Sequence, residues 1–228
     1  MRCGWRGGSG GHLIHVIPRR KGHRLTSTMR QNINLRRRCV AFGLVATTLC
    51  GLVPELAAQE RDAPIFRSGR YQFTLLRPTV TLPSVMLSPL RGKAIDLASL
   101  GGRPILVNFW ATWCAACRIE MPILDRLAQK HRGSGLTIVA VSEDRAERAV
   151  VERFAASLSI HNLNIYMDPN SEVAFTDAAN KRKAPFALYG MPITYAVTAS
   201  GQVIGYMPGA ADWESPDGRQ LIEFLSYR

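Results

Sequence analysis

From residue 105 onward, short continuous apolar runs alternate with stretches in which apolar residues recur every three or four positions. The continuous runs predict buried strands at 105–110, 136–141, 163–167, 193–197 and 203–207. The helical spacing predicts helices at 115–131, 144–158 and 212–227, and residues 171–189 are expected to hold one more short helix. This alternation predicts an α/β domain with a mainly parallel sheet that is covered on both faces.

Upstream of these elements the pattern weakens. Residues 82–87 and 93–97, separated by Pro89 and the turn at 91–92, predict a small strand pair. Residues 59–81 carry four arginines and little periodicity, so they are expected to form a flexible tether. The folded domain is therefore expected to span 82–228.

The first 58 residues have the pattern of a leader. Residues 1–28 are rich in Gly, Arg and His, without sustained periodicity, and are expected to be a non-native upstream extension. Met29 then opens residues 29–58 with a secretory pattern: arginines, an apolar run at 39–53, and small residues at 57–58. This segment is expected to be either a signal peptide that is cleaved after Ala58 or an uncleaved membrane anchor. In both cases residues 59–228 are expected outside the cytoplasm.

Charge is concentrated in that leader. The formal net charge is +12, and residues 1–58 hold ten Lys and Arg against one acidic residue. Residues 59–228 hold nineteen Lys and Arg against sixteen acidic residues, so their net charge is only +3. The basic balance therefore predicts no nucleic-acid partner.

The candidate chemistry lies in two cysteines, Cys114 and Cys117, which follow the first buried strand and open the first helix. The N-terminus of a helix favours a thiolate, because unpaired N–H groups and the positive end of the helix dipole lie there. Cys114 is expected to be the nucleophile that forms a mixed disulfide, and Cys117 the thiol that resolves it. Beyond residue 58 there is no third cysteine, and His131 and His161 have unrelated spacings, so no metal site and no cofactor are expected.

Residues 105–122, which contain Trp-Cys-Ala-Ala-Cys at 113–117 and then Glu120, resemble the active site of the thioredoxin superfamily, in particular its TlpA-like thiol–disulfide oxidoreductases. Gly-Met-Pro-Ile-Thr at 190–194 resembles that family's cis-proline loop, and residues 209–213 resemble the end of the TlpA branch. The likeness covers about 82–227. It implies a thioredoxin-like fold with a central mixed sheet, helices on both faces and an added N-terminal β-hairpin. It also implies a periplasmic location.

The resemblance assigns further roles. Pro192 is expected to be cis and to pack over the cysteines, while the backbone of Met191 pairs with an extended substrate segment. Glu120 has either a role in proton transfer at the cysteines or that of a solvated acid near a helix N-terminus. Asn108 stands where thioredoxin has a buried acid, and an amide cannot act as that base.

Two other features have alternative interpretations. Trp113 is expected either at the rim where partners dock or in the core, whereas Trp110 and Trp213 are expected in the core. The basic stretch at 181–183 either steers an acidic partner or is simply solvated.

Together these residues predict an exported protein dithiol–disulfide oxidoreductase. Reduction of disulfides in a few client proteins is expected, with copper-delivery proteins of cytochrome oxidase or apocytochrome c as the clients that the resemblance suggests. A membrane thiol reductase would supply the electrons. Three alternatives remain: a copper(I)-binding chaperone that uses the same cysteine pair, a disulfide-donating oxidant, and a non-catalytic docking module.

Overall fold

The structure of the protein is a computed structural model that describes residues 62–133, 135–177 and 184–228. The leader at 1–58 and the basic stretch at 181–183 lie outside the described residues. The described helices are the 3-10 helix η1 (Leu97–Leu100), α1 (Ala115–Lys130), α2 (Arg148–Ser157) and α3 (Pro216–Ser226). The described strands are β1 (Arg67–Ser68), β2 (Tyr71–Gln72), β3 (Thr74–Thr81), β4 (Met86–Pro89), β5 (Ile95–Asp96), β6 (Ile105–Trp110), β7 (Thr137–Ser142), β8 (Asn164–Met167), β9 (Ala174–Phe175), β10 (Phe186–Ala187), β11 (Ile193–Val197) and β12 (Gln202–Pro208).

The main sheet has the strand order β3-β12-β11-β6-β7-β8-β4-β5. Within it only β6 with β7 and β7 with β8 pair in parallel, and the other neighbours are antiparallel. The mixed sheet is therefore confirmed, and the mainly parallel sheet expected from the alternation is wrong. The reason is that β11 and β12 form a hairpin and β3 and β4 arrive from the N-terminal side, so only two strand connections are helical crossovers.

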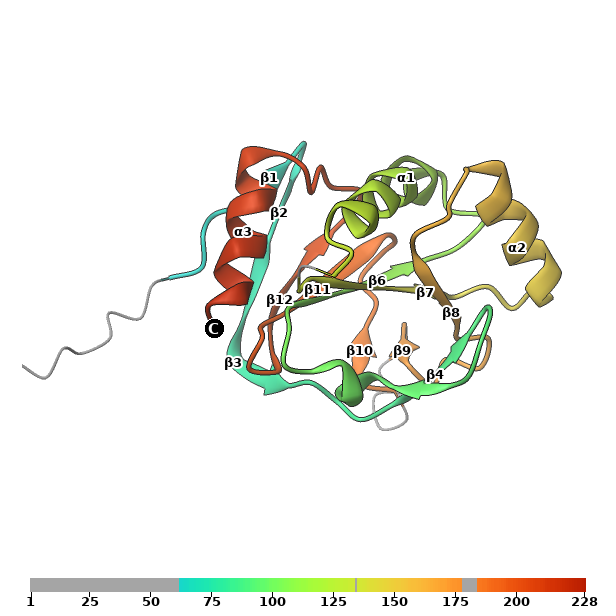
Figure 1. Ribbon diagram of the computed structural model, residues 1–228, viewed down its shortest axis with the longest axis horizontal. Helices are drawn as coiled ribbons and strands as arrows, with labels where there is room; N and C mark the ends of the chain where they lie inside the picture. The colour runs from blue at the N-terminus through green and yellow to red at the C-terminus, as the bar shows by residue number, and fades with distance from the viewer. Residues whose placement is uncertain (1–61, 134, 178–183) are drawn as a thin grey trace, which may run out of the picture. The chain divides into compact units, whose positions relative to one another are not determined.

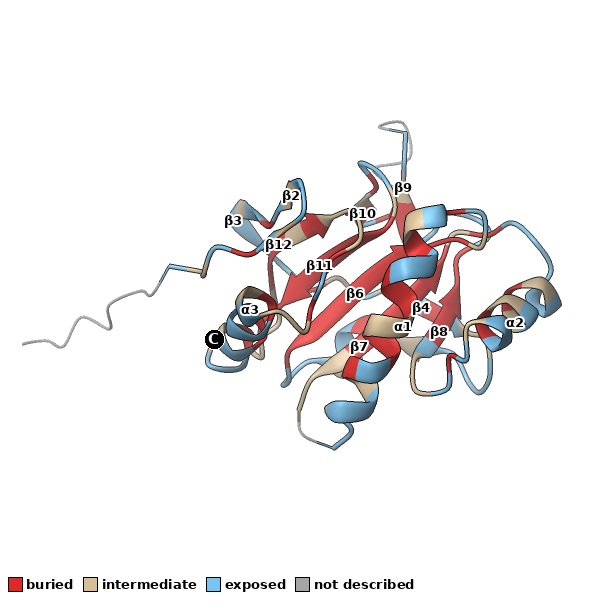
Figure 2. Cartoon of the chain, turned by 90° about the horizontal axis from the view of Figure 1, so that it is seen from above, coloured by how far each residue is buried: buried red, intermediate tan, exposed pale blue. Residues whose placement is uncertain are grey.

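The three α-helices lie on one face of this sheet (Figure 1). The buried residues of α1 and α3 pack on Leu106 and Ala196, and those of α1 and α2 pack on Trp110 and Ala140. On the opposite face, where the sequence predicts further helices, η1 and the short parallel pair β9–β10 cover the sheet instead. Figure 2 shows the central strands as buried between these layers.

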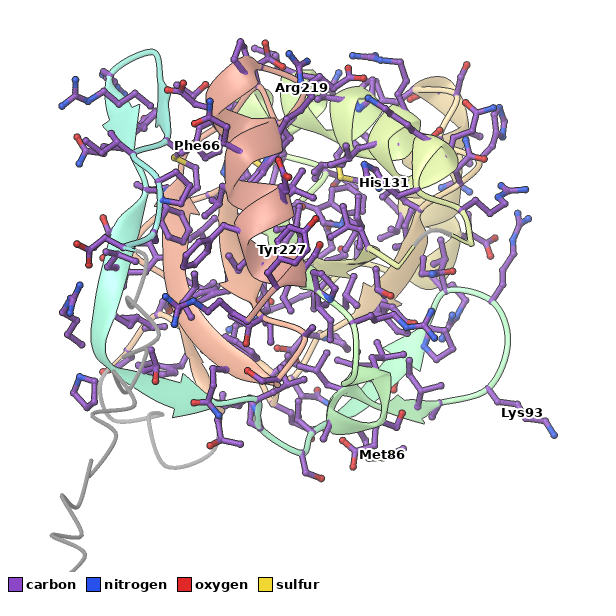
Figure 3. All side chains as sticks on the ribbon, turned by 60° about the vertical axis from the view of Figure 1, so that its left-hand side comes forward. Phe66, Met86, Lys93, His131, Arg219 and Tyr227 are labelled. Carbon is purple, nitrogen blue, oxygen red and sulfur yellow. A yellow bond between two sulfur atoms is a disulfide. The ribbon has the colours of Figure 1, made fainter. Side chains whose placement is uncertain are left out.

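Residues 67–81 are part of the fold and not of a tether. Strand β3 extends the main sheet by pairing with β12, and β1 and β2 form a separate antiparallel pair. Phe66 and Phe73 are buried against the helix-covered face, and Figure 3 shows Phe66 beside α3. The boundary expected at residue 82 is therefore wrong, because an edge strand that is exposed along most of its length has no alternation for a pattern to detect.

The N-terminal hairpin is confirmed, as the antiparallel pair β4–β5. In contrast, the described parts of 171–189 contain β9 and β10 and no helix. Among the described residues, no helix combines the length and the hydrophobicity that crossing a membrane requires.

Candidate functional site

The two cysteines form a disulfide at the N-terminal end of α1, with their Cα atoms 5.3 Å apart. Cys114 is the N-cap residue of α1, and its Sγ accepts a hydrogen bond from the backbone N–H of Cys117 at 3.2 Å. Cys114 is 7% exposed, whereas Cys117 is fully buried. The first sulfur therefore lies where an incoming group can reach it and where helix N–H groups stabilise its thiolate.

Asp144 holds the turn that leads into the disulfide. Its carboxylate accepts hydrogen bonds from the backbone N–H of Thr112 at 2.9 Å and from the Thr112 hydroxyl at 2.6 Å. The Ser142 hydroxyl donates to the same carboxylate at 2.7 Å. Sequence analysis did not single out Asp144, although it follows the strand beside β6, and the carboxyl ends of parallel strands meet at one edge of a sheet.

An apolar groove of about 610 Å³ opens beside Cys114. It is lined by residues from the active-site turn and from the segment that precedes β11: Trp113, Cys114, Ala115, Ala116, Thr176, Leu188, Tyr189, Gly190 and Met191. The side chains of Trp113 and Tyr189 are 68% and 69% exposed, so Trp113 lies at the rim and not in the core. None of the lining residues is charged.

The Met191–Pro192 peptide bond is cis, which confirms the expected geometry. Met191 lines the groove together with Cys114, so the structure brings this loop and the active-site turn to the same opening. The assignment of Met191 as a substrate-pairing residue stays a prediction.

Glu120 lies one turn along α1 from Cys117 and is only 1% exposed. Its Oε1 accepts hydrogen bonds from the indole N–H of Trp213 at 2.9 Å and from the backbone N–H of Ala211 at 3.1 Å. Its Oε2 accepts from Nδ2 of Asn108 at 2.9 Å. The alternative in which Glu120 is a solvated acid is therefore wrong, because the loop before α3 folds over this carboxylate and excludes water.

Burial dominates the ionisation of Glu120. Desolvation raises its pKa to about 7, against the opposing effect of the three donors from Trp213, Ala211 and Asn108. A buried carboxyl group with a pKa near neutrality can both hold and release a proton near neutral pH. The position one turn from Cys117 makes it a candidate acid–base group for that sulfur.

Asn108 connects this carboxyl group to the proline loop. Its Nδ2 also donates to the hydroxyl oxygen of Thr194 at 2.8 Å, and Thr194 lies opposite Asn108 in the β6–β11 ladder. The Oδ1 atom of Asn108 is buried, and no residue in the described part of the chain forms a hydrogen bond with it. When Glu120 is protonated, a rotated Asn108 amide can accept the Oε2 proton at Oδ1, so the same side chain suits both states of the acid.

A second acidic group lies at the carboxyl ends of the parallel strands. Glu143 follows β7 and is half-buried, and its Oε1 has no hydrogen-bond partner among the described residues. Burial, together with the nearby carboxylates of Asp168 and Asp144, raises the pKa of Glu143 to about 8. Within the described ranges no three His, Cys, Asp or Glu side chains are grouped so that they could hold a metal ion.

The sequence profile of the AhpC/TSA family matches residues 78–205, which is more than half of the chain and includes the cysteine pair and the cis-proline loop. The chain belongs to the AhpC/TSA family. Its fold is thioredoxin-like, with a central mixed sheet and an added N-terminal hairpin.

Among curated relatives of this AhpC/TSA protein, the thiol–disulfide oxidoreductase ResA of Oceanobacillus iheyensis is 28% identical over 193 residues, which cover 83% of this chain and 88% of ResA. The thiol:disulfide interchange protein DsbE of Pseudomonas fluorescens is 30% identical over 131 residues, 57% of this chain and 66% of DsbE. A solved thiol:disulfide interchange protein of Chlorobium tepidum is 26% identical, with a TM-score of 0.51 and coverage of 65% of this chain and 97% of its own. These relatives and the site geometry confirm the expected enzyme class, a protein dithiol–disulfide oxidoreductase.

The structure brings Trp113, Cys114 and Met191 together at the groove, and it places Glu120 behind them with Cys117 on the same helix. Sequence analysis missed the two groups that hold Glu120 at Oε1, since Trp213 was assigned only to the core. Trp213 is indeed fully buried, but its indole N–H makes it a polar partner as well. No local pattern connects residues that lie 93 positions apart.

Proposed function

We propose that this AhpC/TSA protein is an exported, periplasmic reductant of disulfides in a small set of client proteins. The single observation that carries the proposal is the position of Cys114, at the N-terminus of α1 and in the wall of an uncharged groove beside the cis-proline loop. The groove admits an extended client segment, and the helix N-terminus stabilises the attacking thiolate.

The reaction balances as a two-electron exchange. The Cys114 thiolate attacks one sulfur of the client disulfide, a new S–S bond forms, and the other client sulfur leaves as a thiolate. The Cys117 thiolate then attacks Cys114 Sγ, which releases the second client thiolate and leaves the Cys114–Cys117 disulfide that the structure contains. The client gains two electrons, and a dithiol partner, proposed to be a membrane thiol reductase, must return them to the protein.

Glu120 is proposed to take the proton of Cys117 as that sulfur becomes a nucleophile. Its burial and its pKa of about 7 support this role, because a carboxyl group with a pKa near neutrality can both accept and release a proton. The spacing of one helical turn places the two groups on the same face of α1. In the oxidised protein the same group can return the proton when the disulfide is reduced.

The nature of the groove favours particular clients. Its lining is apolar and uncharged, and the exposed side chains of Trp113 and Tyr189 extend the apolar surface outward. We therefore propose clients whose cysteine-bearing segments are extended and flanked by apolar side chains. Copper-delivery proteins of cytochrome oxidase and apocytochrome c are the proposed candidates, on the resemblance to TlpA-like proteins. Export by residues 29–58, with or without cleavage, is part of the same proposal.

The test combines trapping with a redox titration. Cys117→Ser should accumulate a mixed disulfide between Cys114 and client proteins, which can be identified by mass spectrometry, and Cys114→Ser should form none. The Cys114–Cys117 pair should have a reduction potential near that of thioredoxin, about −270 mV. A potential nearer −120 mV would make the protein a disulfide donor. Stoichiometric retention of Cu(I) without any thiol turnover would indicate a chaperone instead.

A further inference from the structure

Trp213 occupies an unusual place for a core tryptophan. It lies in the loop before α3, is fully buried, and packs edge-on against Phe66 with ring centroids 5.0 Å apart. The backbone of Gly218 lies so close that a Cβ there would come within 2.7 Å of the Trp213 carbonyl oxygen. The backbone of Trp213 therefore lies against the first turn of α3, while its ring packs on Phe66 and its indole N–H donates to Oε1 of Glu120 at 2.9 Å.

We propose that Trp213 is a positioning residue for thiol–disulfide exchange. Its indole N–H and the backbone N–H of Ala211 both donate hydrogen bonds to Oε1 of Glu120, so Oε1 remains a hydrogen-bond acceptor and the proton binds to and leaves from Oε2. This inference deepens the proposed function and depends on it. Among the described residues, the only hydrogen-bond partner of Oε2 is the amide of Asn108, which can turn to accept the proton. At Oε1, two donors would each have to lose their acceptor or share it with a proton, so protonation there is disfavoured.

Few other groups near Glu120 can shift the pKa of its carboxyl group. The element on its own side, α1, presents Cys117, and β6 and β11 present the neutral Asn108 and Thr194. The loop before α3 presents Ala211 and Trp213. Among the described residues that bond to or act on Glu120, none carries a charge. The hydrogen bond from Trp213 is the largest of the three that favour the ionised form.

A matched tryptophan provides the control. Trp110 is also fully buried, lies on β6 next to the active-site turn and stacks on Phe154 at 5.6 Å, but its indole Nε1 has no hydrogen-bond partner within the described ranges. Replacement of either tryptophan by phenylalanine removes part of a buried ring. Only Trp213→Phe removes a donor to Glu120.

The experiment follows the side-chain carboxyl of Glu120 by 13C NMR as a function of pH, in the oxidised full chain and its variants. The resonance is assigned by its absence in Glu120→Gln. In Trp213→Phe we expect the titration midpoint to rise by about one to two pH units, because the ionised form loses one charge-assisted hydrogen bond. In Trp110→Phe we expect a change below about 0.3 pH unit. Equal midpoints in wild type and Trp213→Phe would overturn the proposal.

A measurement on the wild-type protein tests the proposal even if Trp213→Phe does not fold. The indole 1H–15N resonance of Trp213 should titrate with the same midpoint as the Glu120 carboxyl, whereas that of Trp110 should not follow it. An indole resonance of Trp213 that stays constant through this titration refutes the assignment. Mixed-disulfide trapping in Cys117→Ser tests the proposed function separately, so that trapping with an unchanged midpoint in Trp213→Phe overturns only the role of Trp213.

Discussion

Replacement of Glu120 by glutamine should stabilise the oxidised protein at alkaline pH and leave its stability nearly unchanged at pH 5. The pKa of Glu120 is about 7 in the folded protein and 4.5 in the reference state. Because the folded-state pKa is raised, the folded protein binds more protons than the unfolded chain between these two values, and its stability falls as pH rises through that window. The difference corresponds to about 3 kcal/mol, all of which is lost once Glu120 is fully ionised.

Glutamine keeps the shape of the side chain and remains neutral at every pH. Its Oε1 can accept from Trp213 and Ala211, and its amide N–H can donate to Oδ1 of Asn108 once that amide turns. The assay is urea unfolding of oxidised wild type and Glu120→Gln at steps from pH 5 to pH 9, with the difference in unfolding free energy taken at each pH. That subtraction cancels the titration of other groups, Glu143 included. Parallel stability curves for the two proteins over the whole range would refute the buried, neutralised state of Glu120.

Two further substitutions test other parts of the structure. Burial and neighbouring carboxylates raise the pKa of Glu143 to about 8, so the unfolding free energy should also fall as pH rises through about 8. Glu143→Gln should flatten that part of the stability curve. An unchanged slope between pH 7 and 9 in this variant would contradict the raised pKa of Glu143. Gly209→Ala should cost about 2–5 kcal/mol in urea unfolding, since Gly209 has φ +72° and an added Cβ would lie 2.2 Å from the ring of Tyr71. Gly201→Ala is the control, because Gly201 has φ +79° with open space around it, and this substitution should lower the unfolding free energy by only about 1–2 kcal/mol. Similar losses of unfolding free energy in the two variants would show that the contact with Tyr71 is unimportant.

The elements that sequence patterns predicted well are those with a strong local signal. The buried strand β6 and the helix α1 that follows it could be placed because one is apolar on both faces and the other has apolar residues on one face. The cysteine pair followed directly from their junction. The cis geometry of Pro192 came from a resemblance, because no local pattern distinguishes cis from trans.

Other features depend on contacts between distant parts of the chain. Glu120 is a charged residue in a helix, and its burial becomes visible only when the loop around Trp213 closes over it. Strand β3 is exposed along most of its length, so hydrophobicity could not identify it, and only its pairing with β12 makes it a strand. The face of the sheet opposite the α-helices is covered by η1, β9 and β10. These elements are too short to give a periodic hydrophobic pattern in the sequence.

The incorporation of Phe66 and β3 into the fold also limits how far the protein can reach. A tether over residues 59–81 could extend about 80 Å from the end of the leader, but the chain from residue 58 to the buried Phe66 spans at most about 28 Å. If the leader remains in the membrane, Phe66 stays within that distance of the end of the leader. The accessible disulfides would then be those in segments that emerge from, or are bound to, the same membrane.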